Sequence, residues 1–463
     1  MVLNGAGGRL AGSSVSTPFD TAAAGLPAVT VSTPGKLILM GEHAVVYGRP
    51  ALVAAIDLRL RARFGSPASA RRRGPEEEEV QIDLPALGHR VTVSWAEVLA
   101  YARAAREGWA AYAARPGPAS FRELRGEDPA HVVKVALGEV AAALGEEPGR
   151  APRLRLRLDS ELPIGAGFGS SAAAAVAVVA GYAAWRGGGD AGGGHGAQDA
   201  SGALDLATIE RLALEAERRQ HGLPSGVDTA TSLYGGLLWA QRLPAAATAA
   251  SSAPPPAAGA APAAMAAMGA IGAMSAIAAM APGTPAATPG LATPSAAMPA
   301  GPLICERLAA TSPLLGRLRV YHTGTPPEPT GAVVAAVRAR RDRDPAAHER
   351  LFERMEAVTR ALRSELGLAA ERPPLVVEWM REHQACLEEL GVVPAPVREL
   401  VRQVEAAGGA AKISGAGSLA GPGAGSLLVY HPDPELAAGW DFLRPFPHHP
   451  VHLGAAGFRR EIA

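Results

Sequence analysis

Residues 163–172 read PIGAGFGSSA, three spaced glycines followed by two serines. Glycine has no Cβ atom, so its backbone N–H group can approach an anion closely. The Ala- and Val-rich residues from 170 to 185 are typical of a buried helix, whose amino-terminal end attracts negative charge. We predict a phosphate-binding loop in which either serine can also reach a metal ion; it consists of Gly165, Ala166, Gly167, Phe168, Gly169, Ser170 and Ser171.

Two common nucleotide-binding patterns do not fit this loop. A P-loop has the pattern GxxxxGK[ST], and residues 163–172 contain no lysine. A dinucleotide-binding loop needs its third glycine at position 170, which is a serine, and an acidic residue near the end of the next strand. The residues after the loop are mostly Ala, Val and Gly up to Asp190, so this pattern fails twice. A glycine-rich turn that binds no ligand remains an alternative.

Two further motifs contain charged residues suited to phosphoryl transfer. PGKLILMGEHAVVYG (34–48) has Lys36 after a Pro-Gly pair and then Glu42 and His43. ERRQHGLPSGVD (217–228) places Glu217 near the end of a predicted helix and Asp228 after a Gly- and Pro-containing turn. Phosphoryl transfer needs a phosphate cradle, a carboxylate and hydroxyl for a metal, a cation, and a carboxylate near the attacking hydroxyl. Each of these residues could instead have a structural role. Asp228, for example, could be a helix N-cap.

A second glycine-rich loop, KISGAGSLAGPGAGS (412–426), completes the set of motifs. Together the motifs resemble those of the GHMP kinases, and residues 34–48 are similar to the mevalonate kinase branch of that family. The resemblance covers roughly residues 30–242 and 303–430. It departs from the usual pattern where Phe168 replaces Leu, where Ser414 replaces Thr, and where Ser418-Leu419-Ala420 interrupts the glycine run before Pro422.

The resemblance implies a role for each matching residue. It places Lys36 beside a catalytic Asp228, and it implies that Glu217 and Ser170 or Ser171 hold Mg²⁺ while the loop binds ATP. The acceptor would be mevalonate, phosphorylated on its C5 hydroxyl in the mevalonate pathway of isoprenoid biosynthesis. The residues expected at the substrate site are Glu42, His43, Ser414, Gly415, Ala416 and Gly417.

Rival functions follow from the same residues. A phosphomevalonate or sugar kinase is one, because Arg59, Arg61 and Arg63 on a predicted strand could meet a phosphorylated acceptor. A related decarboxylase is disfavoured by the acid–His pair and by the metal-binding Glu217. The altered second glycine loop and the insert are the features in favour of a catalytically inactive binding protein on the same fold, and the presence of Lys36, Glu217 and Asp228 together argues against it.

The pattern of elements is α+β with two domains. The resemblance implies an N-terminal α/β domain like domain 2 of ribosomal protein S5, a ferredoxin-like C-terminal α/β domain, and an active site between them. We predict a loose tail (1–28), an N-terminal kinase domain (29–242), an uncharged Ala-, Pro- and Met-rich insert (243–302) and a C-terminal kinase domain (303–463). The insert is expected to be low-complexity chain, not a membrane span.

Local patterns predict the individual elements. We expect a strand over 28–33, a turn at 33–35, an apolar segment at 37–40, and a pair of strands within 51–64. Further strands are predicted at 153–158, 234–241, 318–322, 411–414 and 426–430. Helices are predicted at about 95–115, 129–145, 204–220, 328–365, 374–390 and 394–407.

Composition limits the partners and the compartment. Acidic and basic residues balance at 44 each, which gives no electrostatic basis for binding nucleic acid or an anionic membrane. The two cysteines and the absence of a signal-peptide pattern predict a reducing, cytoplasmic location. A homodimer is possible. His448, His449 and His452 are interrupted by proline and lack a carboxylate at ligand spacing, which disfavours a metal site.

Overall fold

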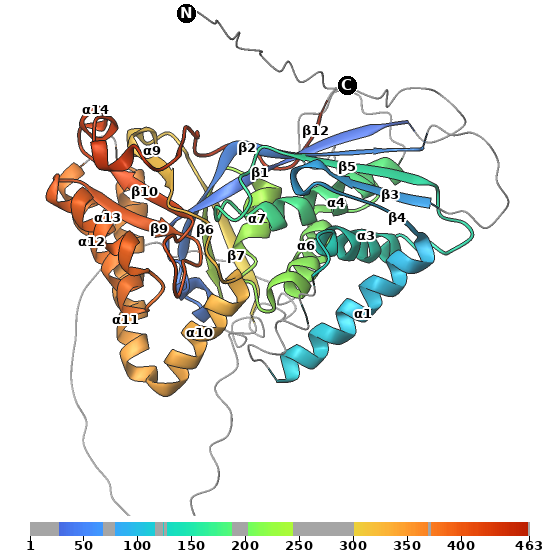
Figure 1. The fold of residues 1–463 in the computed structure, drawn as a ribbon, viewed down its shortest axis with the longest axis horizontal. Helices are drawn as coiled ribbons and strands as arrows, with labels where there is room; N and C mark the ends of the chain where they lie inside the picture. Colours follow the sequence, from blue (N-terminus) through green and yellow to red (C-terminus); the bar gives the residue numbers. More distant parts are fainter. Residues whose placement is uncertain are drawn as a thin grey trace, which may run out of the picture.

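The computed structural model describes residues 27–67, 79–115, 124, 127–187, 202–243, 301–368 and 372–461. Nearly all of the predicted tail and insert lies outside the described residues. The described chain forms two sheets, each covered by helices, and the two sets lie side by side (Figure 1). This architecture confirms the predicted fold class.

The larger sheet has eight strands among the described residues, in the order β12-β1-β2-β5-β3-β4, with β6 and β7 added beside β2. The long strand β2 divides the sheet because its first residues pair with β6 and its later residues pair with β5. All neighbours are antiparallel except β3 and β5. The strands are β1 (Val29–Met40), β2 (Ala51–Gly65), β3 (Glu79–Leu84), β4 (His89–Ser94), β5 (Leu154–Ser160), β6 (Leu237–Arg242), β7 (Leu303–Leu308) and β12 (Arg459–Glu461).

Helices cover one face of this sheet (Figure 1). In β5 the leucines at alternate positions are buried, as the sequence pattern predicts, and they pack with the Ala- and Val-rich helix α4 in the main core. Almost every residue of α4 is buried, so the helix is fixed firmly behind the glycine-rich loop. The helices of this layer are α1 (Trp95–Ala114), α3 (His131–Ala143), α4 (Ser170–Arg186), α6 (Leu206–His221) and α7 (Val227–Tyr234).

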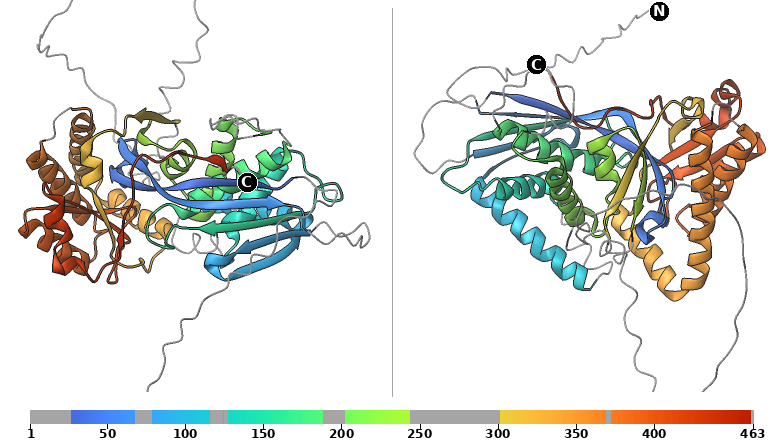
Figure 2. Two further views of the ribbon diagram at one scale, coloured as in Figure 1. Left: turned by 90° about the horizontal axis from the view of Figure 1, so that it is seen from above. Right: turned by 180° about the vertical axis from the view of Figure 1, so that it is seen from behind.

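The smaller sheet is antiparallel, with the order β11-β8-β10-β9. Helices pack against it around a separate apolar cluster that includes Phe352 and Leu427 (Figure 2). Its strands are β8 (Arg319–His322), β9 (Ala410–Ser414), β10 (Ser426–Tyr430) and β11 (His448–His449). The helices of this half are α9 (Pro313–Arg317), α10 (Thr330–Arg343), α11 (Pro345–Leu366), α12 (Pro373–Glu389), α13 (Ala395–Ala406) and α14 (Pro434–Ala438). Short 3₁₀ turns are η1 (Ala44–Tyr47), η2 (Pro85–Leu87) and η3 (Asp441–Leu443).

Two segments from the second half of the chain join the first sheet. Strand β7 pairs with β6, and β12 pairs with β1. Arg59 on β2 fixes the returning segment by donating hydrogen bonds of 2.7 Å to the carbonyls of Ala456 and Gly457. The predicted domain boundaries remain a prediction, but a division at residue 303 does not follow the two sheets.

Two local predictions were wrong. The turn expected at residues 33–35 is part of the continuous strand β1, because a shift in the pairing with β2 between Pro34 and Gly35 accommodates the proline. Bulges are one of the few places where a sheet tolerates proline. The pair of strands expected within 51–64 is the single strand β2, which runs to Gly65 without a turn.

None of the described helices has the length and apolar character needed to cross a membrane.

Candidate active site

The predicted phosphate loop connects β5 to the amino terminus of α4. Gly165, Gly167 and Gly169 all have positive φ angles, of 74°, 82° and 72°, which favour glycine. A Cβ atom on Gly169 would lie 2.8 Å from Cγ of Lys36, so this glycine lets the lysine side chain pass directly beside the loop. No side-chain hydrogen bond caps α4, which leaves its first amide groups suited to an anion.

Lys36 and Asp228 form an ion pair beside this loop. The Nζ of Lys36 lies 3.2 Å from Oδ2 of Asp228. Lys36 stands on β1, where its backbone N–H donates a 2.9 Å hydrogen bond to the carbonyl of Phe168. Asp228 lies in the first turn of α7, an electrostatically favourable place for a carboxylate. The lysine side chain is only 4% exposed, whereas Asp228 is 34% exposed, so the carboxylate alone faces solvent substantially.

Glu217 lies close to the same pair, in the last turns of α6. It is buried, and burial is the main reason why its pKa rises to about 8, with the charge of Asp228 adding to the rise. A hydrogen bond from Ser171 and the charge of Lys36 act in the opposite direction. The structure therefore brings Lys36, Glu217 and Asp228 together beside the glycine-rich loop.

The donor set fits a magnesium ion. Oε1 of Glu217 is buried and has no hydrogen-bond partner among the described residues, so a cation would stabilise it. Carboxylate and hydroxyl oxygens suit Mg²⁺, which usually takes one or two carboxylates and completes its shell with phosphates and water. Glu217 with Ser170 or Ser171 matches that pattern. The described residues contain no cluster of three His, Cys, Asp or Glu side chains that would form an all-protein metal cage.

His221 was not identified from the sequence. Its Nε2 lies 2.8 Å from Oγ of Ser171 and 3.8 Å from Oε2 of Glu217. The signal was present, because His221 follows Glu217 by four residues on a predicted helix and therefore shares its face. His221 links the serine of the loop to the carboxylate of α6.

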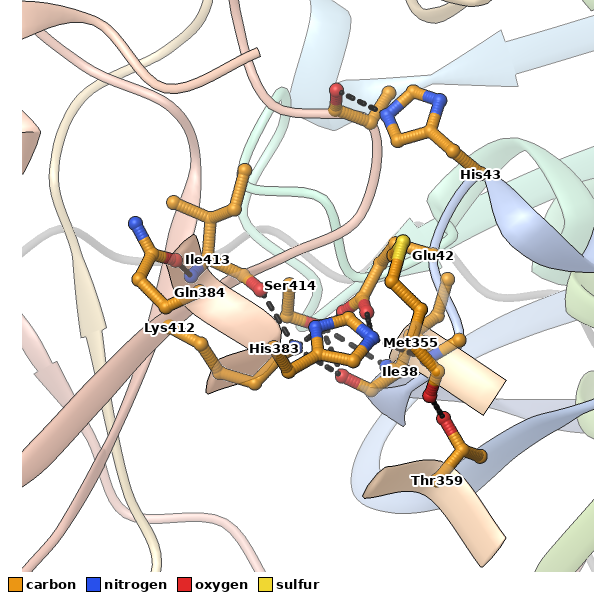
Figure 3. A network of polar contacts seen from close by, with 12 residues as sticks. Ile38, Glu42, His43, Met355, Thr359, His383, Gln384, Lys412, Ile413 and Ser414 are labelled. Atoms are coloured by element: carbon orange, nitrogen blue, oxygen red, sulfur yellow. Dashed lines mark hydrogen bonds and ion pairs between the residues drawn. The ribbon is translucent and has the colours of Figure 1, made fainter. Parts of the chain in front are cut away.

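Glu42 and His43 lie in the turn after β1, and the structure shows what they contact (Figure 3). The Glu42 carboxylate is 1% exposed and pairs with Lys412. Nε2 of His43 lies 3.0 Å from the carbonyl oxygen of Ala416, and burial lowers the pKa of His43 to about 4. His43 is the only described non-glycine residue with a positive φ, of 58°. A substrate-binding role for either residue remains a prediction.

The second glycine-rich loop packs directly on the first. A Cβ atom on Gly167 would lie 3.1 Å from the carbonyl oxygen of Ser414, and Ser426 donates a hydrogen bond to the carbonyl of Ala166. The hydroxyl of Ser414 itself bonds to the backbone of Ile38, at 2.9 and 3.0 Å. Roles for Ser414, Gly415, Ala416 and Gly417 in binding substrate remain predictions.

The residues that lengthen this loop are held in place by an acidic side chain from outside the motif. Oε2 of Glu328 accepts hydrogen bonds from the Ser418 hydroxyl at 2.8 Å and from the Leu419 N–H at 3.3 Å. The Ser418 N–H also donates to the carbonyl of Val392 at 2.9 Å. The departure from the family pattern is therefore accommodated within an ordered loop that still contacts the first one.

The family model described as the GHMP kinases N terminal domain matches residues 131–236, which include the first loop, Glu217 and Asp228. This part of the chain is therefore similar to the N-terminal domain of the GHMP kinases. Mevalonate kinase of Bos taurus is 31% identical to this chain over 230 residues, which cover 45% of the chain and 52% of that protein. The match thus spans about half the length of the curated relative.

Solved structures extend the likeness in fold to nearly the whole chain. Mevalonate kinase of Methanococcus jannaschii has a TM-score of 0.57 and 15% identity, over 93% of this chain and 99% of that one. Galactokinase of Lactococcus lactis complexed with galactose has a TM-score of 0.56 and 13% identity, over 93% and 95%. Since two enzymes named for different acceptors match equally well, the fold does not distinguish between acceptors.

Proposed function

We propose that this chain is a GHMP kinase that transfers the γ-phosphoryl group of ATP to the C5 hydroxyl of mevalonate, giving 5-phosphomevalonate and ADP. The observation that carries the proposal is the Lys36–Asp228 ion pair beside the glycine-rich loop, with its carboxylate open to solvent. The names of the curated relatives support mevalonate as the acceptor.

The proposed mechanism assigns one task to each group. The amide groups of the loop and of the first turn of α4 hold the phosphates. Glu217 and a loop serine would hold Mg²⁺, which neutralises phosphate charge when it is bound. Asp228 orients the acceptor hydroxyl and accepts its proton through its exposed side. Lys36 keeps Asp228 ionised and offsets the charge that develops on the transferred group.

A phosphorylated acceptor receives less support from the arginines of β2. Arg59 donates its hydrogen bonds to the hydroxyl and carbonyl of Ser32 and to the carbonyls of Ala456 and Gly457, so its guanidinium is engaged within the fold. Arg61 forms an ion pair with Glu161. Arg59 and Arg61 are therefore engaged within the fold, whereas Arg63, the third arginine of this strand, is exposed.

The proposal is tested by measuring ADP formation from Mg-ATP with mevalonate, 5-phosphomevalonate and galactose in parallel. We expect turnover with mevalonate only, and one equivalent of 5-phosphomevalonate for each ADP formed. Turnover with one of the other two alcohols instead would support kinase activity and reject mevalonate as the acceptor. ADP formation with none of them, in protein that binds Mg-ATP, would favour the inactive binding protein.

A further inference from the structure

Lysine is rare in this chain and is concentrated around the candidate active site. The chain has three lysines among its 44 lysine and arginine residues, namely Lys36, Lys134 and Lys412. Lys36 and Lys412 are both buried, with 3% and 0% of their surface exposed. A lysine ammonium is a compact charge with three donors, whereas an arginine guanidinium is larger and planar. A chain that uses arginine almost everywhere keeps lysine at two places where the cation is enclosed.

Lys412 has all three of its ammonium protons engaged (Figure 3). It donates to the carboxylate of Glu42, to the carbonyl of Ile38 at 3.3 Å and to the carbonyl of Ile413 at 2.7 Å. These partners lie in the turn after β1, on β1 and on β9, so one side chain ties the two sheets together. Because three acceptors satisfy three donors, the ammonium group is stable in its charged form.

Among the described residues, no lysine or arginine other than Lys412 forms an ion pair with Glu42. Its Oε2 lies 3.6 Å from Nε2 of His383, but that nitrogen accepts a 2.9 Å hydrogen bond from the N–H of Gly41. A ring nitrogen that accepts a hydrogen bond carries no proton, so it cannot donate to Glu42. Burial also holds the pKa of His383 well below its ordinary value, which keeps the ring neutral. The charge of Glu42 is therefore balanced chiefly by Lys412.

Lys36 is a second cation whose charge affects Glu42, without contacting it. The charge of Lys36 lowers the pKa of Glu42, against the larger upward effect of burial and alongside the downward effect of Lys412. Lys36 also lowers the pKa of Lys412, after the larger effect of burial. Lys412 also bonds the carbonyl of Ile38, two residues after Lys36 on β1, so the two lysines contact the same strand. They form one electrostatic group with Glu42 and Asp228, and Glu217 belongs to it through Lys36 and Asp228. Without Lys412, Glu42 would be a buried, unpaired carboxylate, which is a costly state that Lys36 could relieve by leaving Asp228.

We propose that Lys412 is a positioning residue for phosphoryl transfer: by pairing with Glu42, it leaves Lys36 to Asp228. The proposal rests on the proposed function, because Lys36 and Asp228 are the reacting pair there. It concerns Lys412 itself, which is fully buried and would act through Glu42 and Lys36.

Lysine resonances give a test that needs no activity. In protein labelled at lysine Cε with ¹³C and carrying no lysine in any tag, three lysine signals are expected, one for each residue. Lys412→Met should shift the Lys36 signal and leave that of Lys134 unchanged. Lys134→Met is the matched control. Lys134 pairs with a different carboxylate, that of Asp128, at a distance of 2.7 Å. An unmoved Lys36 signal in Lys412→Met would overturn the proposal.

Kinetics supply the second arm. Lys412→Met should lower turnover about tenfold or more, within the range for coupled neighbouring charges, while the Kd for Mg-ADP changes less than about threefold. Glu42→Gln combined with Lys412→Met removes the orphaned charge, so its turnover should lie within about threefold of Glu42→Gln alone. A folded double variant with much lower turnover than Glu42→Gln would reject the proposal, even if Lys412→Met does not fold.

The two proposals can fail separately. If mevalonate is not the acceptor, the kinetic arm is run with whichever alcohol yields ADP, and the lysine resonances are unaffected by that choice. If Lys412→Met shifts the Lys36 signal in a protein that phosphorylates no alcohol, the proposed function is rejected and the proposed role of Lys412 is kept. If the protein phosphorylates mevalonate but Lys412→Met leaves the Lys36 signal unmoved, the proposed function is kept and the proposed role of Lys412 is rejected.

Discussion

Two lysine–carboxylate pairs lie in this part of the molecule, and they differ in one respect. In the pair of Lys36 and Asp228 the carboxylate is 34% exposed, whereas in the pair of Lys412 and Glu42 neither side chain is more than 1% exposed. Under the proposed function a substrate hydroxyl approaches the first carboxylate, whereas the second is enclosed by backbone and by His383. The same two residue types are therefore open to solvent in one place and enclosed in the other.

Burial also sets what each pair contributes to stability. Breaking an enclosed pair by removing one partner leaves an uncompensated charge, which costs about 3–5 kcal/mol. A pair whose carboxylate is 34% exposed should contribute less than an enclosed one, because water already solvates part of that carboxylate. Variants of the open pair should therefore affect turnover, and variants of the enclosed pair should affect the fold first.

The largest effect is expected at Asp228. Asp228→Ala should lower turnover by at least about a hundredfold, the scale of a lost proton acceptor, while binding of Mg-ATP is retained. Steady-state ADP formation and calorimetric binding measure the two quantities. Asp128→Ala is the matched control, because Asp128 also pairs with a lysine, at 2.7 Å, and belongs to none of the motifs. Near-normal turnover in Asp228→Ala would remove this residue from the mechanism.

The enclosed pair should respond in the free energy of unfolding. Glu42→Ala leaves Lys412 buried without its carboxylate and should destabilise the protein by about 3–5 kcal/mol. Asp228→Ala should cost less by the same denaturant titration, because Asp228 is partly solvated even though Lys36 is buried. Equal losses in the two variants would mean that solvent access does not separate the pairs.

Acid should lower the stability of the fold through protonation of the buried His43. Its pKa is about 4 in the folded chain, lowered by burial from an ordinary value of 6.5, so the unfolded chain binds the proton more tightly. Stability should therefore fall as the pH drops from about 6.5 towards 4, by roughly 3 kcal/mol from this residue. His383 acts in the same direction.

Unfolding midpoints measured across this pH range test the assignment to His43. His43→Asn should flatten the dependence in part, and asparagine tolerates the positive φ at this position. His452→Asn is the control, since the His452 side chain is 90% exposed. An unchanged pH dependence in His43→Asn would count against a buried, neutral His43.

The smallest effect is expected from the insert, which belongs to neither pair. Its two ends meet at the hairpin of β6 and β7, where Arg242 pairs with Leu303 and the N–H of Leu243 donates to the carbonyl of Pro302 at 3.0 Å. Replacing residues 244–300 by a short Gly-rich turn should leave turnover unchanged. Stability should stay the same or rise by up to about 2 kcal/mol, because a shorter loop loses less entropy on closure. Loss of folded protein on this replacement would contradict the prediction.

The fold and the shared motifs could be predicted because their signals are local. The strand–loop–helix around residues 163–172 follows from alternating leucines, spaced glycines and an apolar helix that are close together in the chain. Strand β1 was misjudged at Pro34, because the bulge that accommodates the proline depends on pairing with β2. Strands β3, β4, β7, β11 and β12 were missed. All of them except β3 lie at a sheet edge, where a strand is defined by its neighbours more than by its own residues.

By itself, the sequence determined which residue types are available for phosphoryl transfer, because motif spacing records them directly. It placed Lys36, Glu217 and Asp228 on separate elements and could not state how near one another they lie. Only the tertiary structure decided that Lys36 contacts Asp228 and that Lys412 takes Glu42, since partner choice and desolvation depend on residues up to 370 positions apart in the chain. Burial is a property of the packed molecule, and burial separates the partly exposed pair from the enclosed one.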